Sequence, residues 1–318
     1  MNIRQILRFA ANASKTGALS PSWALAPYGQ LPLAMLDLKG GGVRLAGFPD
    51  TDLMLPENAF VLRGLVLLEG LVNHNGFSID SFSNGVLKVK KGNLALLLKT
   101  WEEIFIAHEV FFNLEYDFRL GEQTRVVDIG GNTGIASLYF ASREDIAEVV
   151  SYELFEDTAV RFRENLALNP ELARKIDLRV VGLGDSAADL ELDYCADVKG
   201  SVGLHGIAGH AMDGKATVVK RKVRVESAAT ELQAILERQP AMPLVAKIDC
   251  EGAEYQIMAV LEKMNLLAKI DAFLIEWHEK GPEEIQNRLI AAGHGVWLRT
   301  HPGANHGMIY SCRRAGRA

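Results

Sequence analysis

The chain has 318 residues, of which 48% are hydrophobic and 23% are charged, so it can bury a large core without disulfides or bound metals. Its 34 basic and 40 acidic residues give a formal charge of −6 and are scattered, which argues against nucleic acid as a partner. The three cysteines form no CxxC pair and no even-numbered framework, which favours a reduced, intracellular protein.

Neither a signal peptide nor a membrane span is expected. Arg4 and Arg8 interrupt the apolar stretch at the start of the chain. The most apolar run, residues 60–72, contains Arg63 and Glu69 and is shorter than the roughly 20 residues that cross a bilayer. We therefore expect a soluble, cytoplasmic protein in which residues 60–72 form a buried helix.

Residues 1–99 predict an N-terminal accessory region that is irregular at its start and contains helices and a hairpin. Short strands are expected at Phe77–Ile79 and Val86–Val89, because Asn84 and Gly85 between them favour a tight hairpin turn. This region resembles nothing that indicates a function.

Residues 100–318 have the pattern of one α/β domain. Apolar positions repeat at helical spacing over residues 100–118, and after Glu122 apolar strands alternate with amphipathic helices. Such alternation implies a mostly parallel, doubly wound sheet with helices on both faces. The expected strands are residues 125–129, 149–153, 178–181, 190–194, 217–225, 244–248, 272–275, 296–298 and 308–311, and the expected helices are residues 136–141, 157–168, 253–267 and a segment that begins at Pro282.

A turn of small residues follows the strand at 125–129. It contains Asp128, Gly130, Gly131, Asn132 and Gly134 in the spacing Asp-x-Gly-x-x-x-Gly. Glycines allow a ligand to approach the backbone closely, and the helix that follows presents free N–H groups. Asn132 stands where a dinucleotide motif needs its second glycine, whereas S-adenosylmethionine has no phosphate and tolerates the change. A purely structural strand–helix junction would give the same pattern.

Carboxylates at three successive strand ends predict a ligand site at one edge of the sheet. Asp128 can serve the ammonium group of the ligand. Glu153 lies 19 residues after Gly134, close to the spacing expected for a carboxylate that accepts both ribose hydroxyls. Asp185 can receive an adenine amino group. The alternatives are a solvated glutamate at position 153 and a turn-forming aspartate at position 185.

A second motif, Lys247–Glu254, reads KIDCEGAE. Together with Asp128–Gly134, Tyr152-Glu153 and Ile275–His278, it resembles the FkbM family of methyltransferases over residues 100–311. The resemblance implies a class I methyltransferase with a Rossmann-like, seven-stranded sheet and S-adenosylmethionine as cofactor. The implied acceptor is a hydroxyl oxygen of a small molecule or sugar.

The chain departs from the family pattern at two positions. Gly131 replaces the usual alanine, and Leu154 replaces the proline that usually follows the strand-end glutamate. Neither change removes a functional group, so the expected cofactor is the same. Residues implied to hold this cofactor are Asp128, Gly130, Asn132, Gly134 and Glu153, and Asp249, Glu251 and Glu254 are implied to lie at or near the methyl-transfer centre.

Methyl transfer to a hydroxyl requires alignment of donor and acceptor and removal of a proton. Asp249 is expected beside the sulfonium, where its charge also favours the cofactor. Either Glu251 or His278 can accept the proton, and His278 is favoured because an imidazole titrates near neutral pH. Lys247 is expected to form a structural salt bridge, and Cys250 to be a small buried residue.

No metal site is expected, because none of the remaining histidines shows ligand spacing (His205, His210, His294, His301 and His306). Residues 200–214 are interpreted as a mobile loop over the pocket, or as disorder without that role. Two other functions stay open: a nicotinamide-dependent oxidoreductase, and a catalytically silent S-adenosylmethionine-binding scaffold that uses residues 1–99 for interaction. The sequence does not indicate an oligomeric state.

Overall fold

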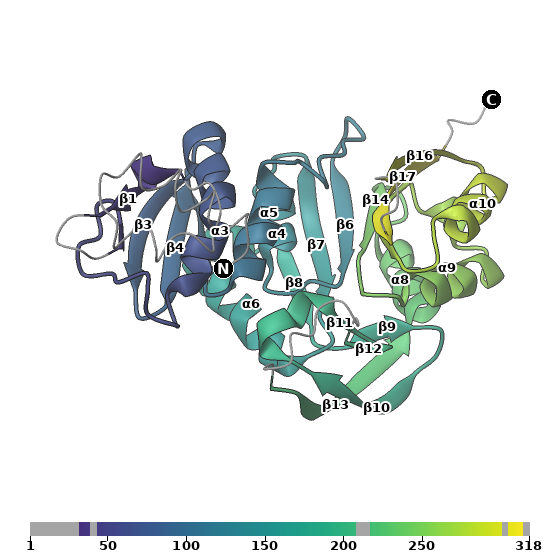
Figure 1. The fold of residues 1–318 in the computed structure, drawn as a ribbon. Helices are drawn as coiled ribbons and strands as arrows, with labels where there is room; N and C mark the ends of the chain where they lie inside the picture. The colour runs from purple at the N-terminus through teal and green to yellow at the C-terminus, as the bar shows by residue number, and fades with distance from the viewer. Residues whose placement is uncertain (1–31, 39–42, 208–216, 301–304, 314–318) are drawn as a thin grey trace. The chain divides into compact units, whose positions relative to one another are not determined.

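The computed structural model describes residues 32–38, 43–207, 217–300 and 305–313. Internal contacts divide the chain into two compact units, one that ends at Leu114 and one that begins at Glu115 (Figure 1). The helix expected at 100–118 is α4, which spans Trp101–Phe111. It therefore belongs to the first unit, although the sequence pattern had placed it at the start of the second.

In the first unit, two helices and a small sheet form the regular structure. The apolar run at 60–72 forms α3 (Ala59–Glu69), as expected, and continues as a π-helical turn over Gly70–His74. Gly64 allows α3 and α4 to approach closely, because a Cβ there would lie 2.8 Å from Ile104 Cδ1. Thr100 caps α4, with Glu103 completing a capping box.

The predicted hairpin is present in a three-stranded antiparallel sheet of the first unit. Its strands are β3 (Ser78–Ser83), β4 (Val86–Lys91) and β5 (Leu94–Leu98). Asn84 and Gly85 have φ values of 50° and 68°, which the tight turn between β3 and β4 requires. The short strands β1 (Leu36–Asp37) and β2 (Arg44–Leu45) pair separately.

The second unit is built on a seven-stranded sheet of order β16-β17-β15-β14-β6-β7-β8. The strands from β15 to β8 in this order are parallel, and β17 is antiparallel to both β15 and β16. This confirms the doubly wound, class I methyltransferase fold. The strands are β6 (Thr124–Ile129), β7 (Ile146–Tyr152), β8 (Ile176–Arg179), β14 (Leu244–Ile248), β15 (Ala272–His278), β16 (His294–Thr300) and β17 (His306–Arg313).

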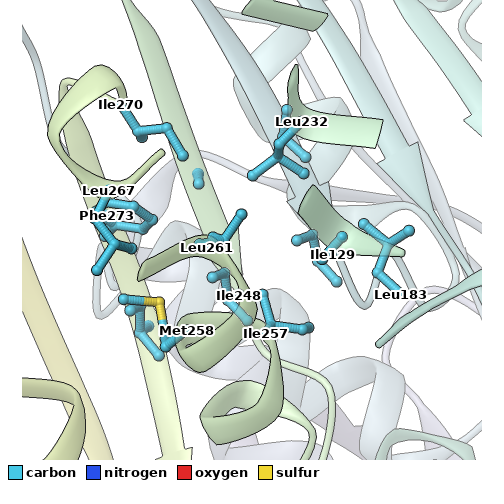
Figure 2. Packing of buried hydrophobic residues seen from close by; sticks show 14 of the residues in the cluster. Ile129, Leu183, Leu232, Ile248, Ile257, Met258, Leu261, Leu267, Ile270 and Phe273 are labelled. Carbon is cyan, nitrogen blue, oxygen red and sulfur yellow. The ribbon is translucent and has the colours of Figure 1, made fainter. Parts of the chain in front are cut away.

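Helices pack their apolar sides on this sheet. The central strands β6 and β14 are buried along their whole length, which explains why their apolar residues do not alternate with solvent-facing polar ones. Figure 2 shows Ile257, Met258 and Leu261 of one helix gathered beside Ile248 and Phe273 of the sheet in one buried cluster. The helices are α5 (Ile135–Ala141), α6 (Glu156–Leu168), α7 (Pro170–Ala173), α8 (Ala228–Arg238), α9 (Glu254–Lys263) and α10 (Glu283–Ala291).

A smaller sheet is inserted after β8. The strand expected at 178–181 is β8, which runs from Ile176 to Arg179 and so begins and ends earlier than expected. The chain then leaves the main sheet and forms β9 (Gly182–Gly184). This strand pairs in parallel with β13 (Val219–Ser227), which is antiparallel to β10 (Ala188–Tyr194). Residues 208–214 of the predicted loop over the pocket lie outside the described ranges. The described part contains β11 (Val202–Gly203) and β12 (Gly206–Ile207).

Other expected boundaries shift for physical reasons. Asp157 does not cap a helix, because α6 begins at Glu156 and the Asp157 carboxylate binds Arg221. Helix α9 ends at Lys263, earlier than expected. All three cysteines are free. Within the described ranges, no helix combines the length and apolar character that a membrane span requires.

Candidate active site

The two sequence motifs meet where the order of the strands reverses. After β6 the chain builds β7 and β8 on one side, and β14 and β15 lie on the other. The N–H of Asp249 donates to the Ile129 carbonyl at 3.0 Å, and the N–H groups of Gly130 and Gly131 donate to the Tyr152 carbonyl at 3.0 and 2.9 Å. Ligands of open α/β sheets bind at such a reversal, outside the carboxyl ends of the strands.

Close packing requires the glycines of the first motif. Gly130 has a φ of +85°, and a Cβ there would lie 1.7 Å from the carbonyl oxygen of Asp249. Gly134 has a φ of +84°, and a Cβ there would lie 2.2 Å from the ring of Phe162. A Cβ at Gly131 would lie 2.3 Å from Ser151 Oγ. The turn is therefore fixed against Asp249 of the second motif on one side and against Phe162 of α6 on the other.

Asp128 lies beneath the turn and is fully buried. Lys247, its register partner on β14, places Nζ 3.1 Å from Asp128 Oδ1 and donates to the Gly130 carbonyl at 2.7 Å. Ser137 Oγ donates to Asp128 Oδ2 at 2.5 Å. Burial alone would lower the pKa of Lys247, but the charges of Asp128 and Asp249 raise it above its usual value. The expected structural salt bridge of Lys247 is confirmed.

Glu153 comes directly after β7 and faces the glycine turn. Its Oε2 accepts from the Asn132 N–H and its Oε1 from the Phe155 N–H, both at 2.9 Å. Burial raises its pKa to about 7, although the two amides act in the opposite direction. Each oxygen keeps one lone pair for a further donor. Asp185, by contrast, follows β9 outside the main sheet and is exposed, with Ser186 Oγ donating to it.

The second motif forms the turn between β14 and α9. Glu251 and Gly252 both have positive φ, of 56° and 103°. Glu254 is fully buried and fixes this turn, because its Oε1 accepts from the Cys250 N–H at 3.0 Å and its Oε2 accepts from the Gly252 N–H at 2.8 Å. The turn therefore has a single, well-defined backbone path. Asp249 precedes it, and its side chain is 25% exposed.

His278 ends β15 and faces this turn; it belongs to the strand, which is longer than expected. Its Nδ1 lies 3.1 Å from Glu254 Oε1, and its Nε2 lies 3.8 Å from Glu251 Oε2 and 3.9 Å from Glu276 Oε1. Tyr255 Oη donates to the carbonyl of His278 at 3.0 Å and so holds the strand end.

The charges of this centre change the protonation of its members. Burial alone would lower the pKa of His278, but the hydrogen bond with Glu254 and the charge of Glu251 outweigh it and raise the pKa to about 10. At neutral pH the imidazole therefore carries its proton. The sequence argument for His278 as the base assumed a pKa near neutral, and the raised pKa removes that argument. Burial raises the pKa of Glu251 to about 8, against the opposing effect of His278.

Sequence reasoning missed several residues of the centre. Tyr116 Oη donates to Asp249 Oδ2 at 3.0 Å, and the Tyr116 ring lies 5.5 Å from Lys247 Nζ. His306 Nδ1 lies 3.0 Å from Glu276 Oε1. Glu115 pairs with Arg299, and burial raises its pKa to about 7. The contacts join segments far apart in the chain, and Tyr116 had been assigned to a helix, so no sequence signal pointed to them.

The hairpin at 202–207 contacts the turn between β14 and α9, which the second motif forms. A Cβ at Gly203 would lie 2.6 Å from the carbonyl oxygen of Cys250 and 2.8 Å from that of Glu251. A Cβ at Gly252 would in turn lie 3.2 Å from the His205 ring. The described part of the predicted pocket loop therefore lies at the site, whereas His210 and His301 fall outside the described residues.

The family model for the methyltransferase FkbM domain matches residues 128–310, which is more than half of the chain and includes both motifs. The chain belongs to the FkbM methyltransferase family. It is an S-adenosylmethionine-dependent methyltransferase, and this membership argues against the nicotinamide-dependent alternative.

Individual relatives of this FkbM methyltransferase are distant. The AMB antimetabolite synthetase AmbE of Pseudomonas aeruginosa is 24% identical over an alignment of 208 residues that covers 56% of this chain, and the chain spans about a tenth of that relative. The FkbM methyltransferase of Methylobacillus flagellatus is 12% identical, with a TM-score of 0.43 over 80% of this chain and 60% of that one. TrmK of M. capricolum, solved with S-adenosylhomocysteine, is 8% identical, with a TM-score of 0.36 over 64% and 67%.

The residues at the sheet edge fit the cofactor of the family. The Glu153 oxygens each have one lone pair available, which suits the two hydroxyl donors of a ribose. Asn132 Oδ1 is buried without a hydrogen-bond partner and can accept from a bound ligand. Asp249 supplies a partly exposed carboxylate at the same edge of the sheet, which suits a positive sulfur. These groups are acceptors, as expected for a ligand that carries hydroxyls, an ammonium and a positive sulfur.

Proposed function

We propose that this FkbM methyltransferase methylates a hydroxyl oxygen of a small molecule or sugar. The observation that carries the proposal is the pair formed by Glu251 and His278, whose Oε2 and Nε2 atoms lie 3.8 Å apart. A hydroxyl oxygen fits between two such atoms, at hydrogen-bond distance from both. Such a pair is suited to orienting a hydroxyl and to taking its proton.

Each residue of the centre has a defined task in this proposal. S-adenosylmethionine supplies a methyl group on a positive sulfur. Asp249 favours that positive charge, and Glu153 holds the ribose at the other end of the edge. Glu251 accepts the acceptor's proton while His278 orients the oxygen. Gly130, Gly131, Asn132 and Gly134 form the cofactor turn, and Asp185 receives the adenine amino group, as the sequence predicts. Asp128 is predicted to serve the ammonium group, but it is fully buried beside Lys247, so we assign it to support of the turn from beneath.

One curated relative and the charge of the chain support a small-molecule acceptor. That relative, from Pseudomonas aeruginosa, is a synthetase of an antimetabolite, so a segment like this chain occurs within such a synthetase. The acidic balance of the chain, with a formal charge of −6, also disfavours a nucleic-acid substrate.

The test is a paired acceptor screen. The purified protein is incubated with S-adenosylmethionine and hydroxylated compounds, each beside the matched amine in which nitrogen replaces the oxygen. Formation of S-adenosylhomocysteine with hydroxyl compounds alone, and a methyl ether identified by NMR, is the expected result. Methylation of the amines alone would overturn the proposal while leaving the family membership intact.

A further inference from the structure

Three side chains of the centre form a group with the chemistry of a divalent-cation site. One ligand atom from each of Asp249, Glu276 and His278 lies within 4.8 Å of the other two. Two carboxylates and one imidazole are ligands for cations such as Mn²⁺ and Zn²⁺. The group joins the end of β14 to the end of β15, so the main sheet itself sets its spacing.

Each of these three side chains is already held by a partner outside the group. Tyr116 Oη donates to Asp249 Oδ2 at 3.0 Å, His306 Nδ1 lies 3.0 Å from Glu276 Oε1, and Glu254 Oε1 lies 3.1 Å from His278 Nδ1. Metal-binding sites are typically built in this way, because outer partners orient the ligands, and a carboxylate on one imidazole nitrogen directs the other nitrogen to the metal. A mere surface cluster of acids would have no such set of partners.

The spacing suits a cation after small side-chain rotations. On an octahedral ion with bonds of about 2.1 Å, ligand atoms lie about 3 Å apart when adjacent and about 4.2 Å apart when opposite. His278 Nε2 and Glu276 Oε1 lie 3.9 Å apart, between these limits. Glu251 Oε2, 3.8 Å from Nε2, places a further carboxyl oxygen beside the group.

Lys247 is the positive group that could compete with a cation. Its Nζ lies 3.5 Å from Asp249 Oδ2, but it lies closer to Asp128, at 3.1 Å, and to the Gly130 carbonyl, at 2.7 Å. Its charge is therefore directed mainly toward β6. Because Tyr116 and Lys247 both use Asp249 Oδ2, the second carboxylate oxygen has neither of these contacts.

We propose that Asp249, Glu276 and His278 bind a divalent transition-metal cation at the methyl-transfer centre. This inference rests on the proposed function: a cation on Nε2 of His278 would release the proton of that nitrogen to solvent and would take over from the imidazole the orientation of the acceptor hydroxyl. It would also lower the pKa of the hydroxyl, whose proton Glu251 would accept. Tyr116, His306 and Glu254 are then positioning residues for the three ligands.

The test is Mn²⁺ binding by the full-length protein after removal of metals with a chelator, without cofactor or acceptor. Titration calorimetry and the loss of the free-Mn²⁺ paramagnetic resonance signal should both give one bound ion. Glu276→Gln and Asp249→Asn should each weaken binding at least tenfold. The matched control is Glu284→Gln, on the exposed side of α10, which should bind Mn²⁺ like the parent.

The outcomes separate this inference from the proposed function. Binding of S-adenosylhomocysteine is measured on the same samples, and circular dichroism verifies that each variant is folded. The metal site is refuted if the parent binds no Mn²⁺. It is also refuted if Glu276→Gln and Asp249→Asn both bind Mn²⁺ as tightly as the parent. In that case an active, metal-free methyltransferase in the acceptor screen would still support hydroxyl methylation.

Discussion

Lys247 and Asp128 form a buried ion pair across the two central strands, with Nζ 3.1 Å from Oδ1 and side chains that are 2% and 0% exposed. The pair lies beneath the cofactor turn, and Lys247 also binds the carbonyl of Gly130. It therefore links the stability of the sheet to the shape of the site.

Replacing Lys247 by methionine should destabilise the protein by about 3–5 kcal/mol, because it leaves the Asp128 carboxylate buried without a counter-charge. Urea unfolding measures the change. The double variant Lys247→Met with Asp128→Asn should recover a large part of it, since no charge is then left buried. A single variant that lost less than about 1 kcal/mol would show that the pair is not needed for stability.

Glu153→Ala should weaken binding of S-adenosylhomocysteine about tenfold or more, because it removes the acceptor assigned to the two ribose hydroxyls. Calorimetric titration measures the dissociation constant. Glu156→Ala, on the exposed first turn of α6, is the control and should bind like the parent. Equal affinity of the Glu153→Ala variant and the parent would contradict the ribose assignment.

The buried Glu153 also predicts a pH dependence of stability. Its pKa is raised from 4.5 to about 7 in the folded protein, so the folded state holds the proton more tightly than the unfolded state. Its contribution is fully present below pH 4.5 and is lost as the pH rises through 7, by about 3 kcal/mol.

Urea unfolding at pH 5 and pH 8 tests this linkage. Glu115 and Glu251, whose pKa values are also raised, act with the same sign, so the parent should lose stability over this range. The Glu153→Ala variant should lose less than the parent by about 3 kcal/mol. Parallel pH profiles of variant and parent would show that Glu153 does not titrate as described.

His278→Ala should leave cofactor binding within about twofold of the parent and lower turnover by 10²-fold or more, because the side chain acts on the acceptor rather than on the ribose. Calorimetry with S-adenosylhomocysteine and a turnover assay with an accepted hydroxyl compound give the two quantities. His74→Ala, at an exposed position of the first unit, is the control. A large loss of cofactor affinity would show that His278 contributes to cofactor binding and would contradict its assignment to the acceptor.

Gly203→Ala should impair turnover more than it impairs folding. A Cβ at this position would lie 2.6 Å from the Cys250 carbonyl, so the turn that carries Glu251 must shift. Turnover should fall at least tenfold while the unfolding midpoint changes little. Gly206→Ala in the same hairpin meets no atom within 4 Å and serves as a comparison, although its positive φ adds strain of its own.

Much of the fold could be predicted because the central strands are buried on both faces. The mainly apolar segments at 125–129 and 244–248 identify β6 and β14 almost to the residue. The predicted range of β15 ends at Ile275, because Glu276 and His278 are polar. In the structure, pairing with β17 continues to His278. Polar residues that face a site interrupt the apolar pattern, so the end of such a strand is hard to predict from the sequence.

The site was predictable to the extent that strand ends meet at one edge. That rule brings Asp249, Glu251 and His278 together, whereas Asp185 follows β9, which lies outside the main sheet, so its role stays a prediction. The pKa of His278 depends on Glu254, whose buried position and hydrogen bonds exist only in the folded chain. Local sequence carries no information about such long-range charges.

The contact between Gly130 and the Asp249 carbonyl has a consequence for recombination between family members. Because a Cβ at position 130 would lie 1.7 Å from that oxygen, the two motifs tolerate no independent drift of their backbones. A chimaera that takes only one of the two motifs from a relative should pack poorly where that motif contacts the other, because the two backbones come from different proteins. Changes of acceptor preference are better introduced in the hairpin at 202–207 at positions other than Gly203, because Gly203 packs against the turn that follows Asp249.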